Sequence, residues 1–316
     1  MASTLILAHT PASLQADQAS STSQLQRRLA GSFYEEETDS GLGFVQIRVI
    51  GFGLAGTTAL TLVAKYPVLG LSFVDHAQTE FVSSAPEKMI FSAIDRLLGR
   101  AHALVLLVDE SDAAQTKQAT LVSNRAKTQG LLTIGVALAA GLGTSDAAST
   151  VSNDFTTSVH SFIRLVALDA QHTTSGTAAV LHSLTAGLAT LCNVQGYVGV
   201  DYEDVRTILQ WPARLAVGVG IAGGSDRARV ATLAAMANAQ PTPLGIHGAQ
   251  RLLVIVSAPP NALRLSECKE AMNTVRGALS KDAHCIFGTM HSDLLSDQWG
   301  GPASDQMQVT VMATSP

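Results

Sequence analysis

Short apolar runs alternate with longer segments of helical length along most of this chain. Runs rich in Val, Ile and Leu that end at glycine or polar residues predict strands, and the segments between them predict helices. In the first half we expect strands at 44–50, 69–74, 103–108, 131–138 and 163–168, and helices up to Ala64, at 89–98 and at 113–127. Such alternation predicts a parallel sheet with helices on both faces.

The second half begins with a long predicted helix over 177–192, which carries leucines at helical spacing. A helix at 201–209 and glycine-rich strands follow it. The remaining pattern predicts strands at 251–257, 284–288 and 308–312, with a helix at 265–279. We expect these strands to form a second sheet, so that the long helix connects two α/β halves.

The pattern divides the chain into four parts. Residues 1–43 are rich in Ser, Gln, Ala and Thr and predict a flexible tail. We expect a Rossmann-type parallel-sheet domain over 44–175, a central helix and linker over 176–198, and a smaller α/β domain over 199–316.

The composition limits which partners the protein can bind and which cellular compartment we expect for it. The chain is 47% hydrophobic and only 14% charged, with a mean hydropathy of +0.25, yet no apolar run approaches the ~20 residues of a membrane helix. A net charge of −5 provides no basic surface for nucleic acid. The three cysteines lie far apart, and the first residues do not form a secretory signal. We therefore expect a cytoplasmic protein without disulfides.

A glycine turn is the first candidate site. Gly51, Gly53 and Gly56 have G-x-G-x-x-G spacing between a predicted strand and helix, where backbone N–H groups can approach a phosphate. Asp75 lies near the position of the acid that binds ribose in a Rossmann dinucleotide site, which allows an NAD(P)-dependent enzyme. Alternatively, the glycines only permit a tight strand-to-helix turn.

Two downstream segments carry a family resemblance. Residues 199–206 read GVDYEDVR and residues 218–228 read GVGIAGGSDRA. They resemble the "VDFADVRT" loop and the "GxGxAxGxDRA" segment in the second half of the FtsZ/tubulin-like fold. Residues 49–59 are similar to the opening of the same family, so the resemblance covers about 44–314. It implies an α/β fold with a GTPase-type first domain and a central helix.

The resemblance also implies functional residues. Gly51, Gly53 and Gly56 would contact phosphate, and Asp75 and Gln78 match the next nucleotide loop. In the family, a loop with two aspartates enters the nucleotide site of the neighbouring subunit and polarises the attacking water.

Asp201 and Asp204 match those two aspartates. From the residues alone, Asp201 is also a good N-cap for a helix that begins near Tyr202. Both roles remain open. In the 218–228 segment we expect Asp226 to cap the next helix and Arg227 to pair with an acid.

The first domain departs from the family where phosphates bind. Leu54 and Ala55 replace glycines. Where the family has a glycine-rich phosphate loop, this chain has Asp109-Glu110-Ser111-Asp112. A carboxylate ~4 Å from a phosphate would repel it by about 4 kcal/mol at an effective dielectric constant of ~20. A bridging Mg²⁺ would reverse that sign, and residues 141–146 are a rival match to the phosphate loop.

We therefore expect a divergent FtsZ-like cytoskeletal protein that acts by subunit assembly, or by capping or modulating FtsZ filaments, with weak or absent GTP binding. Its expected partners are itself, a conventional FtsZ, or both. We expect no cofactor, or GTP with Mg²⁺ if the site functions. The family's membrane-binding tail has no counterpart after Pro316, so no direct membrane anchor is expected. The alternatives are an active FtsZ-like GTPase and, more distantly, the NAD(P)-dependent enzyme.

Overall fold

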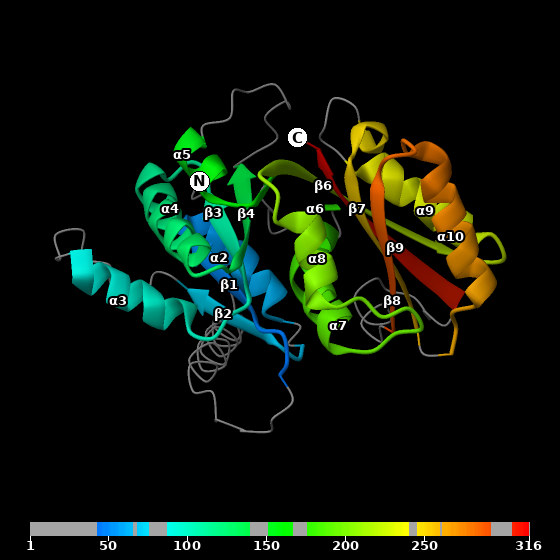
Figure 1. Ribbon diagram of the computed structural model, residues 1–316, viewed down its shortest axis with the longest axis horizontal. Coiled ribbons are helices and arrows are strands. Elements are labelled where there is room, and N and C mark those ends of the chain that lie inside the picture. Colours follow the sequence, from blue (N-terminus) through cyan, green and yellow to red (C-terminus); the bar gives the residue numbers. More distant parts are fainter. Residues whose placement is uncertain are drawn as a thin grey trace, which may run out of the picture. The chain divides into compact units, whose positions relative to one another are not determined.

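The computed structural model describes residues 43–65, 68–75, 87–139, 151–166, 176–239, 245–259, 261–291 and 305–315. Residues 1–42 of the predicted tail, Gln78 and the rival segment 141–146 lie outside these residues. Figure 1 shows the described elements along the chain.

The strands and helices agree closely with the hydrophobic pattern. The strands are β1 (Ile47–Phe52), β2 (Leu71–Asp75), β3 (Ala103–Asp109), β4 (Leu132–Ala139), β5 (Ser161–Val166), β6 (Ala213–Gly223), β7 (Arg251–Ala258), β8 (His284–His291) and β9 (Gln306–Ser315). The helices are α2 (Gly53–Val63), α3 (Glu87–Leu98), α4 (Ala113–Thr128), α5 (Asn153–Ser158), α6 (Gly176–His182), α7 (Leu188–Asn193), α8 (Tyr202–Leu209), α9 (Arg227–Asn238) and α10 (Leu265–Ala278).

The described strands form one sheet in the order β2-β1-β3-β4-β5-β6-β9-β7-β8. The prediction of a second sheet was wrong, because β5 and β6 pair in parallel at Ser161–Ala213 and Phe162–Arg214 and so join the two halves. Strands β1 to β5 are parallel, as predicted. Their carboxyl ends therefore meet at one edge of the sheet, here called the carboxyl edge, and their amino ends meet at the opposite amino edge.

Helices cover both faces of the parallel strands. Helix α4 packs on β3 and β4 with α3 and α5 beside it, whereas α2 packs on β1 and β3 (Figure 1). Every residue of β3 is buried, as expected for a central strand covered on both faces. One core cluster includes Leu104, Leu106 and Val108 of β3 together with Val122 and Phe155 of the covering helices.

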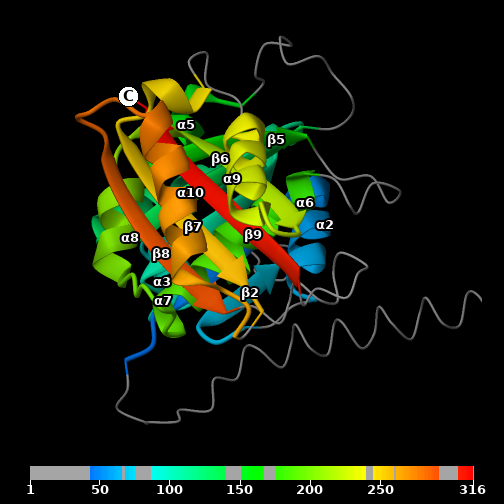
Figure 2. The ribbon, with the colours of Figure 1, turned by 90° about the vertical axis from the view of Figure 1, so that its right-hand side faces the viewer.

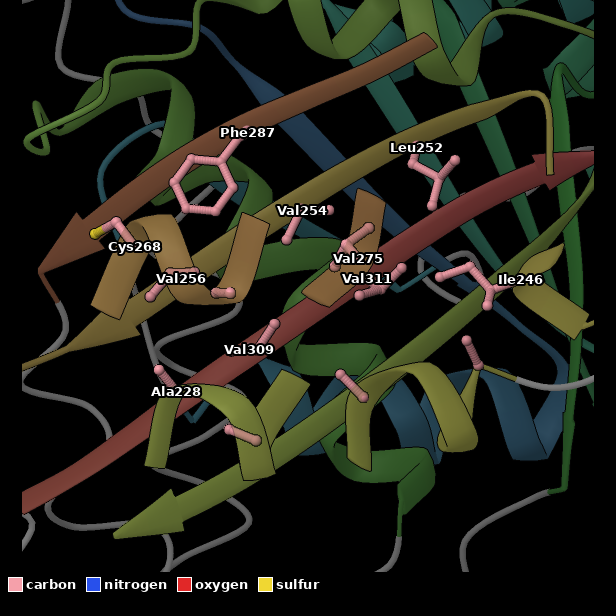
Figure 3. Packing of buried hydrophobic residues seen from close by; sticks show 14 of the residues in the cluster. Ala228, Ile246, Leu252, Val254, Val256, Cys268, Val275, Phe287, Val309 and Val311 are labelled. Carbon is pink, nitrogen blue, oxygen red and sulfur yellow. The ribbon is translucent and has the colours of Figure 1, made fainter. Parts of the chain in front are cut away.

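The carboxyl-terminal half buries its own apolar cluster. Helices α9 and α10 pack together on one face of β6, β7 and β9 (Figure 2). Figure 3 shows Val254 and Val256 of β7 and Val309 and Val311 of β9 directed into this cluster. Residues two apart on a strand share a face, so each of these two pairs of valines points into the same cluster.

The predicted long helix is present and contains an unpredicted change of helical type. Segment η2 (Ser183–Gly187) is a π-helix between the α-helices α6 and α7, so one π-helical part interrupts the α-helical bonding. At its end, the Asn193 side chain donates to the carbonyls of Val45 and Leu69 and accepts from the Val45 N–H. Asn193 thus ties the end of this helix to the amino edge. None of the helices that the structure describes is long and apolar enough to cross a lipid bilayer.

Candidate functional site

The glycine turn at the carboxyl edge is built by close backbone packing. A Cβ at Gly51 would lie 2.8 Å from the Gly56 carbonyl oxygen, and a Cβ at Gly56 would lie 2.3 Å from the Leu107 carbonyl oxygen on β3. Gly53 has φ of 73°, a conformation that favours glycine. The spacing therefore has a structural reason in which no ligand is needed: it lets α2 leave β1 sharply and pack against β3.

The Asp109 carboxylate occupies the amino end of α2. Its Oδ2 accepts a hydrogen bond from the Ala55 N–H at 3.0 Å, and a Cβ on Gly53 would lie 2.7 Å from the Asp109 Cβ. Its Oδ1 accepts from the Ser111 N–H at 3.0 Å and from the Ser111 hydroxyl at 2.6 Å. The Ala55 N–H, one of the N–H groups at the amino end of α2 that could bind a phosphate, is thus bonded to a side chain of the protein.

These hydrogen bonds keep Asp109 ionised. Burial of the carboxyl group opposes its ionisation, but the bonds from Ser111 and Ala55 outweigh burial and hold the pKa of Asp109 below its ordinary 3.8. The amino end of a helix favours a negative charge for the same reason that it favours phosphate. Asp109 therefore supplies the anion that this turn is suited to bind.

The other two acids of the loop also have partners. Glu110 forms a bidentate ion pair with Arg164 of β5, with distances of 2.7 Å to Nε and 2.5 Å to Nη2. The Asp112 side chain accepts from the Gln115 N–H at 3.0 Å and caps α4. The loop predicted to take the place of a glycine-rich phosphate loop is thus held by contacts within the chain.

These residues do not fit a phosphate at the glycine turn in the arrangement observed. A phosphate that bonds to the Ala55 N–H would have to displace Asp109, or approach its carboxylate with a bridging cation. Asp75 lies at the end of β2 on the same edge, and its Oδ1 accepts from the Thr57 hydroxyl at 3.3 Å. Gly51, Gly53, Gly56 and Asp75 are thus brought together, while Gln78 lies outside the described residues.

Asp201 and Asp204 lie at the other edge, at the start of α8. The Asp201 carboxylate accepts from the Asp204 N–H at 2.8 Å, and the Asp204 carboxylate accepts from the Asp201 N–H at 3.3 Å. This reciprocal capping box confirms the N-cap role expected for Asp201. Asp201 is exposed and Asp204 half-buried, so both are accessible at the surface. Their role towards a neighbouring subunit stays a prediction.

Helix α8 lies along the amino edge. At its start the Tyr202 hydroxyl donates to the His102 carbonyl just before β3, and at its end the Leu209 carbonyl accepts from the Ser161 hydroxyl at the start of β5. The glycine turn contacts Asp109 at the far end of β3, which is seven residues or ~23 Å long. One chain therefore cannot bring its own Asp201 and Asp204 to its own glycine turn.

The glycine-rich segment after α8 is structural. A Cβ at Gly218 or Gly220 would lie 1.9 or 2.0 Å from backbone carbonyl oxygens of α9, so both glycines let β6 pack directly on that helix. The expected pairing of Arg227 is confirmed, because its guanidinium binds Glu267 at 2.7 Å in a buried position. The expected cap was wrong: the Asp226 side chain binds Arg229 and makes no capping bond.

We searched the described residues for metal ligands and for disulfides. No group of three or more His, Cys, Asp or Glu side chains there could hold a metal ion. The three cysteines are free, and burial raises the pKa of the Cys192 thiol to about 12.

Known proteins resemble this chain in sequence and in fold. Residues 214–315 match the family model "FtsZ family, C-terminal domain". The cell division protein FtsZ of Buchnera aphidicola is 24% identical over 313 residues, covering 85% of this chain and 78% of that protein. FtsZ of Neisseria meningitidis is 29% identical over 136 residues, 43% of this chain. That match spans only 33% of the Neisseria protein, so the chain spans about a third of the length of the first curated relatives it matches.

Solved structures share the fold across both halves. A structure titled "FtsZ dimer, empty" from M. jannaschii has a TM-score of 0.66 and 18% identity, covering 89% of this chain and 93% of that one. CetZ1 from Haloferax volcanii, titled as a GDP-bound monomer, has a TM-score of 0.57 and 13% identity, covering 85% of this chain and 94% of that one.

The chain has the FtsZ/tubulin-like fold, and its residues 214–315 match the FtsZ family model. The sequence resemblance is thereby confirmed, as is the fold class of a Rossmann-type parallel sheet followed by a central helix and an α/β carboxyl-terminal region. The structural glycines Gly218 and Gly220 and the buried Arg227 all lie inside the matched residues.

Two contacts around the glycine turn of this FtsZ-like chain were not predicted. The bond between Asp109 and the Ala55 N–H was missed, although β1 and β3 are both predicted strands and their following loops must meet if the strands are neighbours. The pair formed by Glu110 and Arg164 was also missed. No sequence signal identifies that pair, because it depends on the register of β4 and β5.

Proposed function

We propose that this chain is a cytoskeletal FtsZ-like protein that works through subunit contacts, with weak or absent GTP binding. One observation carries the proposal: the Asp109 carboxylate is bonded to the Ala55 N–H at the amino end of α2. This hydrogen bond supports the view that an anionic side chain of the protein already occupies the turn.

The energy involved is large enough to matter. A phosphate held ~4 Å from the Asp109 carboxylate would lose about 4 kcal/mol at an effective dielectric constant of ~20. That loss corresponds to roughly three decades in the dissociation constant. If Asp109 moved aside instead, its hydrogen bonds to Ser111 and Ala55 would break, and losing them would also cost free energy.

The two edges support a role in assembly. Asp201 and Asp204 lie at the amino edge, and the glycine turn lies at the carboxyl edge, so a contact between these surfaces joins two different chains. Such a head-to-tail contact is heterologous and can continue into a filament. The relative titled "FtsZ dimer, empty" is consistent with a contact in which no nucleotide takes part. With a conventional FtsZ as partner, the same amino edge would cap or modulate its filaments.

Assembly without nucleotide tests this proposal. The purified chain is freed of nucleotide with apyrase and charcoal, then sedimented alone, with GTP and Mg²⁺, and with EDTA. We expect the same pelleted fraction in all three samples. Negative-stain images of the chain, with and without a conventional FtsZ, should then show whether it assembles alone or on FtsZ filaments. Polymer that forms only with GTP and Mg²⁺ would contradict the proposal.

One observation favours an alternative, an active GTP-hydrolysing filament protein. Asp201 and Asp204 are retained at an accessible surface, as an intersubunit hydrolysis loop would require. In that case Asp109 would bind Mg²⁺ rather than repel phosphate. Steady GTP turnover that is lost in Asp204→Asn would favour this alternative.

A further inference from the structure

Helix α9 carries a strip of apolar residues on its exposed side. Val230 and Leu233 are each 44% exposed, Ala237 is exposed and Ala234 is half-buried. With 3.6 residues per turn, positions 230, 233, 234 and 237 fall within about 100° of the helix circumference. These four neighbouring residues therefore form one continuous strip, here called the α9 face.

The opposite side of α9 is apolar as well. Ala228, Ala231 and Ala235 are buried in the carboxyl-terminal apolar cluster, where Figure 3 shows Ala228. The charged side chains of α9 are two arginines, Arg227 and Arg229, and each of them is paired with an acid. A helix that is apolar on opposite sides is typical of one that is covered on both sides.

The order of large and small residues along the α9 face matches a second α9 that runs in the opposite direction. If a two-fold axis passes between positions 233 and 234, Val230 of one copy meets Ala237 of the other. The same axis places Leu233 against Ala234. Each large side chain thus faces a small one in both halves of the contact, so the α9 face is complementary to itself and two helices can pack closely.

The charges of α9 favour the antiparallel direction. The amino end of a helix carries a partial positive charge and the carboxyl end a partial negative charge. Arg229 lies in the first turn of α9, and its side chain is 49% exposed. Antiparallel pairing brings each Arg229 beside the carboxyl end of the other helix, whereas parallel pairing would place the two arginines side by side.

We infer that α9 binds the α9 of a second copy in an antiparallel two-fold pair, with Leu233 at its centre. The inner side of α9 packs on β6 and β9 (Figure 2). Its outer side therefore belongs neither to the carboxyl edge nor to the amino edge of the parallel sheet. This contact goes beyond the proposed function, because it uses a different surface and joins chains in closed pairs.

The size of the α9 face sets the strength of the contact. Its side chains bury far less than the ~800 Å² per partner of a stable complex. Separate copies should therefore pair with a dissociation constant of roughly 0.1–1 mM. Copies that are held in assemblies meet at a higher effective concentration, so the pair should form more fully there.

Cysteine cross-linking of the full chain tests the pair and its direction. In the antiparallel pair Val230→Cys faces Ala237→Cys, whereas the two copies of residue 230 lie ~10 Å apart along the helix axis. An equimolar mixture of the two variants should therefore form disulfide-linked dimers at least about tenfold faster than either variant alone. Leu121→Cys is the matched control for random collisions, because Leu121 is also 44% exposed but lies on α4. The unmodified chain gives the background from its three free cysteines.

A second variant tests the strength of the pair. Leu233→Asp should weaken pairing by roughly 100-fold, because the two-fold axis places the substitution in the contact twice. Sedimentation equilibrium of the full chain without nucleotide measures this loss, and Leu121→Asp should pair as well as the unmodified chain. Circular dichroism checks that both variants are folded.

Three results would overturn the pairing. They are an unmodified chain that stays monomeric at ~1 mM, a Leu233→Asp variant that pairs as well as the unmodified chain, and Val230→Cys alone cross-linking as fast as the mixture. Any of them would leave the proposed function standing. Pelleting that requires GTP would instead contradict the proposed function and leave the α9 pair in place.

Discussion

The two edges of the parallel sheet both carry acidic residues, but they use them differently. At the carboxyl edge, Asp109 and Glu110 are buried and bonded to groups from other elements of the fold. At the amino edge, Asp201 and Asp204 are accessible and bonded mainly to each other, within one helix turn. The first pair connects segments that are distant in the sequence, whereas substitution of the second pair should lower the free energy of unfolding only slightly.

The comparison teaches that acidic residues in a nucleotide-binding fold have to be judged by their partners. Asp109 and Glu110, at the predicted place of a phosphate loop, are bonded to groups of the chain itself. Asp201 and Asp204, predicted to face a neighbour, form a local capping motif and are accessible at the surface. The four predictions below test the difference, beginning with the largest expected effect.

Glu110→Ala should cause the largest loss of stability. The substitution removes the bidentate partner of the Arg164 guanidinium, which is itself mostly buried. We expect the free energy of unfolding to fall by about 3 kcal/mol, as for breaking a largely buried pair. Urea denaturation measures the change. Glu203→Ala, which removes an exposed acid of α8, is the control and should cost far less free energy of unfolding. Equal losses in the two variants would contradict the proposed difference between the acids of the two edges.

Asp109→Ala should cost about 2 kcal/mol, because it removes the acceptor of the Ala55 and Ser111 hydrogen bonds. The variant should also respond to anions. Millimolar phosphate or sulfate should raise its melting temperature by occupying the vacated amino end of α2, and should leave the unmodified chain unchanged. Thermal denaturation with chloride as the control ion measures this. If both proteins respond alike, Asp109 does not fill an anion site.

The edges should also differ in their dependence on pH. Burial, with Lys127 and Arg206 nearby, lowers the pKa of His160 at the amino edge from 6.5 to about 4. The unfolded chain then takes up a proton below pH 6.5 before the folded one does, so stability falls as the pH drops from 6.5 to about 4. His160→Asn should remove roughly 1–2 kcal/mol of this loss, allowing for partial solvent exposure.

Asp109 acts in a lower pH range. Its pKa is depressed, so its contribution is complete above its ordinary 3.8 and is lost only as the pH falls below that value. His182 titrates in the same range as His160, since burial lowers its pKa to about 4. Comparison of the His160 variant with the unmodified chain therefore isolates the amino edge. A stability curve that is unchanged in His160→Asn would contradict the assignment.

We expect the smallest stability effects at Asp201 and Asp204. Asp201→Asn keeps a good N-cap and should change the free energy of unfolding by only a few tenths of a kcal/mol, whereas Asp201→Ala should cost about 1 kcal/mol. If the carboxylates also contact a neighbour, Asp201→Asn combined with Asp204→Asn should reduce the sedimenting fraction while the protein stays folded. Unchanged sedimentation of this double variant would leave the aspartates with a capping role alone.

The order of elements was predictable from sequence because apolar runs, helix lengths and glycine turns are local signals. Gly51 and Gly56 were placed correctly in a strand-to-helix turn, and Asp201 was placed correctly as an N-cap. Contacts between distant segments were not predictable. The short β5–β6 pairing that merges two expected sheets depends on the three-dimensional course of α8. Asp226 failed as a cap because the nearby Arg229 competes for its carboxylate.

Equilibrium binding of labelled GTP, with and without Mg²⁺, tests the central claim most directly. If Asp109 fills the place of a phosphate, the unmodified chain shows no saturable binding at micromolar GTP under either condition. Saturable micromolar binding that unlabelled GTP displaces would contradict the claim.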